Sequence, residues 1–191
     1  LKGEDSMVEG WRLLCAIGMQ SEGVDILFDD YCLLYPYSPM IPRLRYEYAL
    51  LLFDRRDYEG AGKLFSYIDV KDVSRRQRPE FLYKRAWCDF AVGNESRAAE
   101  RFEEVAGLKS PAYSGAACFT LGYINYDNGR FGEALRWFGK ANDKRFADLS
   151  AYYTLDCRFQ LKDYEYVVAN GDELLPKFQD ERAKHVARLL S

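Results

Sequence analysis

The sequence predicts an all-α chain of about five antiparallel helix pairs followed by one terminal helix. An alanine with an aromatic residue four positions later recurs at Ala61, Ala98 and Ala134, in steps of 37 and 36 residues. These steps are close to the ~34-residue period of helix-turn-helix repeats. No sustained period-two alternation bounded by hairpin turns is present, which disfavours strands. Apolar residues make up 48% of the chain and charged residues 30%, with only six prolines, as in globular proteins.

The spacing of these alanines sets the order of the elements. We expect repeats near 5–39, 40–74, 77–111, 112–146 and 147–176, and a further helix over 178–190. The outer repeats are weaker copies of the central ones, because Leu27 lies 34 residues before Ala61 and Val167 lies 33 residues after Ala134. The chain starts at Leu1 and its last helix has no partner after it, so we expect a single domain that is a piece of a longer chain.

Close packing of two helices explains why alanine recurs. Antiparallel helices approach closely only where side chains are small, and a small residue stands twelve positions before each alanine, at Ala49, Ala86 and Gly122. We expect these residues to face the alanines across the helix crossing. A bulkier residue at any of the three alanines would overpack the contact and cost about 1–3 kcal/mol.

This pattern resembles the tetratricopeptide repeat. The resemblance implies a right-handed α-α superhelix whose first helices line a concave inner surface that holds another molecule, and whose stability is close to a sum over neighbouring repeats. In the first repeat, four residues fall where the family pattern places Trp, Leu, Gly and an aromatic residue: Trp11, Leu14, Cys15 and Gly18.

A shorter stretch, residues 35–65, is similar to repeat proteins of the bacterial cell envelope. It begins with Tyr35-Pro36-Tyr37-Ser38, which looks like the Tyr-Pro-x-Ser linker of an outer-membrane assembly lipoprotein and of the periplasmic partner of the Tol-Pal system. The resemblance implies a periplasmic or cell-envelope location. The cytoplasm is the alternative, because five cysteines fit the periplasm poorly.

Charge and reactive residues argue against several functions. A net charge of −3 disfavours nucleic-acid binding, and no apolar run is long enough for a membrane span. The cysteines lack Cys-x-x-Cys spacing and the single histidine is His185, so we expect neither a metal nor another cofactor. Because one histidine in the last helix offers no set of nucleophile, base and orienting group, we expect no enzyme activity.

An aromatic stripe marks the first helix of each pair. Positions fifteen and eight residues before the anchors are aromatic, and a separation of seven places them on one helix face. With the rings between them, the predicted binding residues are Tyr46, Phe53, Tyr83, Trp87, Phe90, Phe119, Tyr123, Tyr126, Tyr152 and Phe159. Two interpretations remain open: the rings pack against the neighbouring repeat, or part of the stripe stays exposed as a binding surface.

The sequence therefore predicts a non-enzymatic scaffold that binds a protein or peptide through an aromatic concave groove. The alternative is a structural spacer within a larger solenoid that binds through its end faces. Family members that clamp acidic peptides use Lys, Asn and Arg on this surface, where the present chain has Tyr46, Leu50 and Asp54, so that type of co-chaperone is not expected. The terminal helix, with Val186 and Leu190, is a candidate for self-association.

Overall fold

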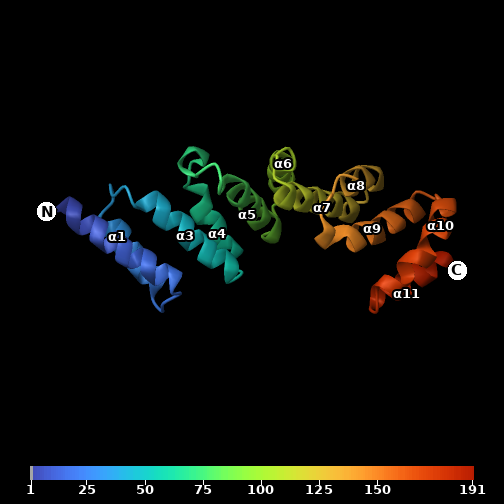
Figure 1. Cartoon of the computed structure of the whole chain (residues 1–191), viewed down its shortest axis with the longest axis horizontal. Coiled ribbons are helices and arrows are strands. Elements are labelled where there is room, and N and C mark those ends of the chain that lie inside the picture. The colour runs from blue at the N-terminus through green and yellow to red at the C-terminus, as the bar shows by residue number, and fades with distance from the viewer. Residues whose placement is uncertain (1) are drawn as a thin grey trace. The chain divides into compact units, whose positions relative to one another are not determined.

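The computed structural model describes residues 2–191, with side chains from Asp5 onward, and contains helices but no strand in that range (Figure 1). The predicted all-α class is thus confirmed. The α-helices are α1 (Lys2–Gly18), α2 (Val24–Leu34), α3 (Ile41–Asp54), α4 (Tyr58–Ser66), α5 (Arg78–Ala91), α6 (Glu95–Ala106), α7 (Pro111–Asp127), α8 (Phe131–Phe138), α9 (Ala147–Gln160), α10 (Tyr164–Leu174) and α11 (Glu181–Leu190). Short 3-10 helices follow α4, α8 and α10: η1 (Val70–Asp72), η2 (Lys144–Phe146) and η3 (Leu175–Lys177).

The chain divides into two compact units, Leu1–Asn94 and Glu95–Ser191. The first contains α1 to α5 and the second α6 to α11. Within the first unit α3 packs on α4, α4 on α5 and α1 on α3; within the second, α7 packs on α6 and α8, and α9 on α8 and α10. The boundary lies inside the predicted repeat 77–111, where the periodicity of the sequence has no break.

Four turns between consecutive helices share one geometry. Three residues connect α3 to α4, α5 to α6, α7 to α8 and α9 to α10. The middle residue of each turn has a positive φ: 63° at Arg56, 82° at Gly93, 69° at Gly129 and 64° at Lys162. Glycine adopts this left-handed conformation at no steric cost, whereas arginine and lysine adopt it with a steric penalty from their Cβ atoms. Asp57 precedes the first residue of α4, and its carboxylate caps this helix by accepting a hydrogen bond from the amide of Gly60.

The predicted small residues and their alanine anchors are buried. Ala61, Ala98 and Ala134 are completely buried, and Val167 takes the same place in α10. Ala49, Ala86 and Gly122 are also buried. Gly122 differs from the prediction in its neighbour, because a Cβ there would lie 2.5 Å from the Phe138 ring rather than against Ala134.

The register predicted for the first helix pair is wrong. Most of the residues that the repeat pattern placed at packing positions are exposed: Trp11, Cys15, Gly18 and Leu27. Burial in α2 falls instead on Val24, Phe28 and Tyr31, which repeat the spacing of Ala61, Phe65 and Ile68.

A longer turn explains this shift. Residues 19–23 connect α1 to α2, two more residues than in the turns described above. Gly10 therefore takes the place of the small residue on the first helix. It is buried, and a Cβ there would lie 2.7 Å from the Tyr31 hydroxyl and 3.0 Å from Met40 Cγ. The first helix pair therefore also has a close approach at a small residue, but its anchor in α2 is Val24, three residues before the predicted Leu27.

Candidate ligand-binding surfaces

The first unit places one predicted binding residue in its core. Tyr46 on α3 is only 6% exposed, and its ring centroid lies 6.2 Å from that of Phe81. Phe53 is partly exposed and packs edge-to-face on Tyr58, with 5.3 Å between centroids. Tyr46 thus follows the packing interpretation of the stripe.

Three predicted residues form a partly exposed patch on α5, here called the α5 patch: Tyr83, Trp87 and Phe90. Trp87 lies at its centre. Its ring is stacked near Tyr83, with centroids 6.2 Å apart and planes at 27°, and lies 5.6 Å from Phe90. The three rings therefore present continuous aromatic area on one helix.

Lys84, a cation on the same helix as these rings, is engaged within the protein. Its ammonium group lies 3.2 Å from a Glu80 oxygen, 3.6 Å from an Asp54 oxygen and 4.9 Å from the centre of the Phe53 ring. The lysine side chain is mostly buried. Because two carboxylates and a ring already surround the charge, Lys84 is poorly suited to capture a ligand carboxylate.

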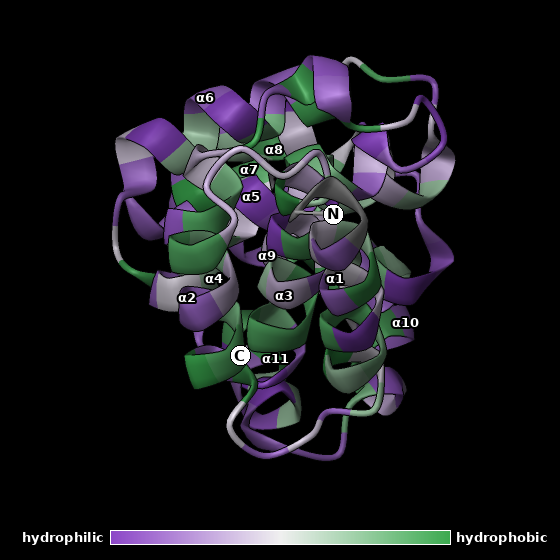
Figure 2. Cartoon of the chain, turned by 90° about the vertical axis from the view of Figure 1, so that its left-hand side faces the viewer, coloured by the Kyte–Doolittle hydropathy of each residue, from purple (hydrophilic) through white to green (hydrophobic). Residues whose placement is uncertain are grey.

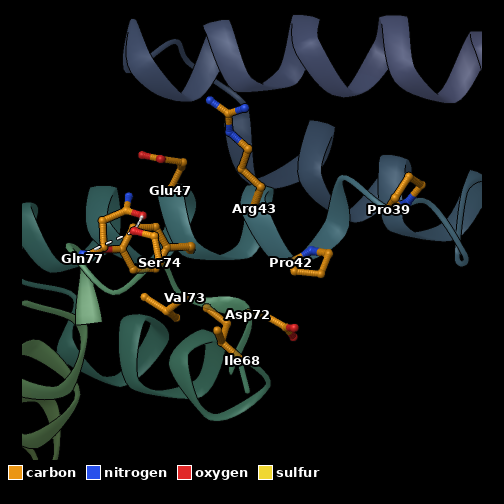
Figure 3. Close-up of a pocket in the computed structure, with 10 residues that line it drawn as sticks. Pro39, Pro42, Arg43, Glu47, Ile68, Asp72, Val73, Ser74 and Gln77 are labelled. Atoms are coloured by element: carbon orange, nitrogen blue, oxygen red, sulfur yellow. Dashed lines mark hydrogen bonds between the residues drawn. The ribbon is translucent and has the colours of Figure 1, made fainter. Parts of the chain in front are cut away.

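A cavity of about 470 Å³ adjoins the buried Tyr46 (Figure 3). Pro42, Arg43 and Glu47 of α3 border one side, and Ile68 and Val73 of the connection to α5 border the other. The remaining lining residues are Pro39, Asp72, Ser74 and Gln77. Sequence periodicity did not indicate this cavity, because half of its wall is non-helical. Its rim carries both charge signs, which favours no single class of ligand.

In the second unit the predicted rings gather around Tyr153, a residue that the sequence did not single out. Its centroid lies 6.2 Å from that of Phe119, 5.6 Å from Tyr123, 4.9 Å from Tyr126 and 5.1 Å from Tyr152. We call these five rings the Tyr153 cluster. Tyr153 precedes the α10 anchor by fourteen residues instead of fifteen, so the spacing rule passed over it.

The outer predicted rings of this unit pack on following segments. Tyr152 lies 5.6 Å from Phe178 and 5.9 Å from His185, and Phe159 lies 5.5 Å from Tyr164. Tyr152 and Phe159 thus contribute to packing in the C-terminal part of the chain. On α7, Tyr123 lies between the other two predicted rings, Phe119 and Tyr126.

A buried carboxylate connects three helices beside the Tyr153 cluster. Asp156 of α9 is 2% exposed and accepts hydrogen bonds from the Tyr126 hydroxyl of α7 and, at 3.4 Å, from the Gln160 amide. The His185 Nε2 of α11 lies 3.2 Å from an Asp156 oxygen. Burial, and next the hydrogen bond to Asp156, raise the pKa of Tyr126 well above its usual range. Since this phenol stays protonated, the arrangement ties helices together and supplies no activated nucleophile.

The cysteines are packing residues for the most part. All five are free thiols; Cys88, Cys118 and Cys157 are buried, whereas Cys15 is exposed. Burial, with a smaller contribution from Asp156, raises the pKa of Cys157 to about 12. Among the residues with described side chains, 5–191, no three His, Cys, Asp or Glu residues come together as a metal site would require.

Comparison with known proteins identifies no relative whose function could be compared with this geometry. No protein-family model and no curated protein matches the chain. Of the helices described, none is both long and apolar enough to cross a bilayer.

Proposed function

We propose that this chain is a non-enzymatic scaffold that binds a protein or peptide segment through aromatic surfaces on the first helices of its pairs. The observation that carries the proposal is the α5 patch, where Trp87 lies between Tyr83 and Phe90 and all three are partly exposed. Aromatic rings supply large contact areas at a low cost in conformational entropy and dominate binding hot spots.

We further propose that the helix pairs belong to a right-handed superhelix of the tetratricopeptide-repeat type. The repeated three-residue turns with a positive middle φ support this proposal. So do the small buried residues at regular spacing, Ala49, Ala86 and Gly122. The similarity of residues 35–65 to cell-envelope repeats supports a periplasmic or envelope location for the protein.

The partner best suited to these surfaces is a largely apolar peptide segment or helix. Lys84 is neutralised by Glu80 and Asp54, so recognition of a terminal carboxylate by this residue is disfavoured. In the second unit, the partly exposed Tyr123 and Tyr153 also offer aromatic contact area to an apolar partner.

Affinity capture from source cells tests this proposal. The parent chain is compared with Trp87→Ala/Tyr123→Ala and with Tyr67→Ala, a control that removes a tyrosine that is 60% exposed and lies outside the stripe. Circular dichroism first verifies equal helix content. A partner retained by the parent and the control but lost by the double variant supports aromatic binding, and equal capture by all three chains contradicts it.

A second candidate function, a spacer that binds through its end faces, is favoured by the exposed apolar residues of α1 and α2. Under this alternative, variants at Trp87 and Tyr123 leave capture unchanged, whereas variants at Leu27 and Leu34 abolish it. The same capture experiment therefore separates the two functions.

A further inference from the structure

A groove between α1 and α2 has the form of a helix-docking site. It is lined by positions 9, 12, 13 and 16 of α1 and by positions 27, 30, 31 and 34 of α2, and encloses about 490 Å³. Both sets have the spacing i, i+3, i+4, i+7, so one face of each helix borders the groove along about two turns. All of the lining residues belong to the first unit.

The exposed apolar side chains of the protein are concentrated here. Among residues with described side chains, nine of the fourteen large exposed hydrophobic ones lie between Met7 and Tyr37. Leu27 and Leu34, which line the groove, are 48% and 70% exposed. Figure 2, which is seen from the side on which α1 lies, shows both apolar and polar segments along α1. Apolar exposure of this density marks an interaction surface.

The groove has an acidic border. Residues 1–35 contain seven acidic and two basic residues, a net charge of −5 where the whole chain has −3. Asp30 lines the groove, and α2 contains three aspartates and no Lys or Arg. The one cation that lines it, Arg12, is paired with Glu9. The charged side chains that line the groove, Glu9, Arg12 and Asp30, leave it with a net charge of −1, which attracts and orients a cationic partner.

We propose that the α1–α2 groove binds an amphipathic helix whose apolar face is flanked by lysine or arginine. Helical rows on both walls suit a third helix that places apolar residues at i, i+3 or i+4, and i+7. Addition of a strand is disfavoured, because residues 2–191 form no sheet edge. This site is separate from the α5 patch, so either can fail without the other.

A second copy of the chain is the less suitable occupant. The most basic amphipathic helix of the protein, α11, carries Arg182, Lys184 and Arg188. Its apolar residues Val186, Leu189 and Leu190 already pack in a core cluster with α9 and α10. Docking of α11 into another copy would require that cluster to open.

A peptide titration tests the proposal. The probe is a helical peptide of leucine and lysine, about 15 residues long, with leucines spaced for one apolar face; its partner peptide replaces every lysine by glutamate. Fluorescence anisotropy measures the affinity of each for the full chain. We expect the lysine peptide to bind at least about tenfold more tightly than the glutamate peptide, and its affinity to fall as salt is raised.

Three variants locate the site. Leu27→Ser/Leu34→Ser should weaken binding of the lysine peptide about tenfold or more, and Asp30→Lys about threefold at low salt. Leu161→Ser/Val168→Ser should leave binding unchanged, because these residues are exposed to a similar degree, at 49% and 65%, but lie in the second unit. Since every substituted side chain is on the surface, all variants should keep the parent's circular dichroism.

Four results would overturn the proposal. These are equal binding of the lysine and glutamate peptides, unchanged binding by Leu27→Ser/Leu34→Ser, and sedimentation of the parent with phosphatidylcholine vesicles that this variant abolishes. The fourth is a concentration-dependent dimer of the parent that is lost in the same variant, because the occupant would then be a second copy.

Discussion

Gly122→Ala tests a close helix contact of the second unit. A Cβ at this position would lie 2.5 Å from Cδ1 and Cε1 of Phe138. The ring cannot easily retreat, since its centroid lies 5.6 Å from Tyr153 with the planes 8° apart, and 5.8 Å from Phe119. Overpacking costs about 1–3 kcal/mol, whereas alanine gains about 1 kcal/mol over glycine inside a helix. The clash therefore prevails, and the free energy of unfolding should fall by about 1 kcal/mol.

Gly132→Ala is the matched control. Gly132 lies in α8, the helix that also carries Phe138, and no atom lies within 4 Å of the position its Cβ would take. This substitution should stabilise the unit by about 0.4–1 kcal/mol through the smaller entropy of the unfolded chain. The same chemical change thus has opposite signs at two places ten residues apart in sequence.

Urea titrations followed by circular dichroism measure both effects. A parallel thermal scan should show the melting temperature of Gly122→Ala falling by about 4–8 °C and that of Gly132→Ala rising by less. The comparison uses the transition of the second unit, because two units can unfold separately. The packing argument is refuted if Gly122→Ala proves as stable as the parent or as Gly132→Ala.

Two further predictions concern buried polar groups. Tyr126→Phe should lower the free energy of unfolding by about 1–3 kcal/mol, because the buried Asp156 carboxylate loses a hydrogen-bond donor; a variant as stable as the parent in urea titrations would contradict this account. Iodoacetamide at pH 8 should modify Cys15 and spare Cys157, since a pKa of about 12 leaves about one thiolate in ten thousand at that pH; mass mapping that finds Cys157 alkylated first would argue against its burial.

The helix pairs could be predicted because their signal is local. The position of a small anchor residue can be predicted from the spacing within one helix pair, without reference to distant parts of the chain. Ala61, Ala98 and Ala134 are buried as expected. The first pair could not be placed in the same way, because its register depends on a turn two residues longer. Spacing alone made Leu27 the anchor, while Val24 takes that place.

The candidate site was predicted less completely, because periodicity gives a helix face but not what covers it. Tyr46 and Tyr83 occupy equivalent places in the stripe, yet Tyr46 is buried and Tyr83 is partly exposed. Tyr153 lies one residue off the stripe and still contacts rings of α7 and α9. Only the tertiary packing shows which rings become core and which remain available.

The two proposed surfaces differ in the physical force that would drive binding. The α5 patch contains three neutral rings, and the neighbouring Lys84 is already paired, so association there depends on apolar area and should change little with salt. The α1–α2 groove combines exposed leucines with an acidic border. Screening at about 0.1 M ionic strength acts over roughly 10 Å and weakens such exposed attraction. The salt dependence of capture therefore distinguishes a client of the α5 patch from a client of the groove, even before either is identified.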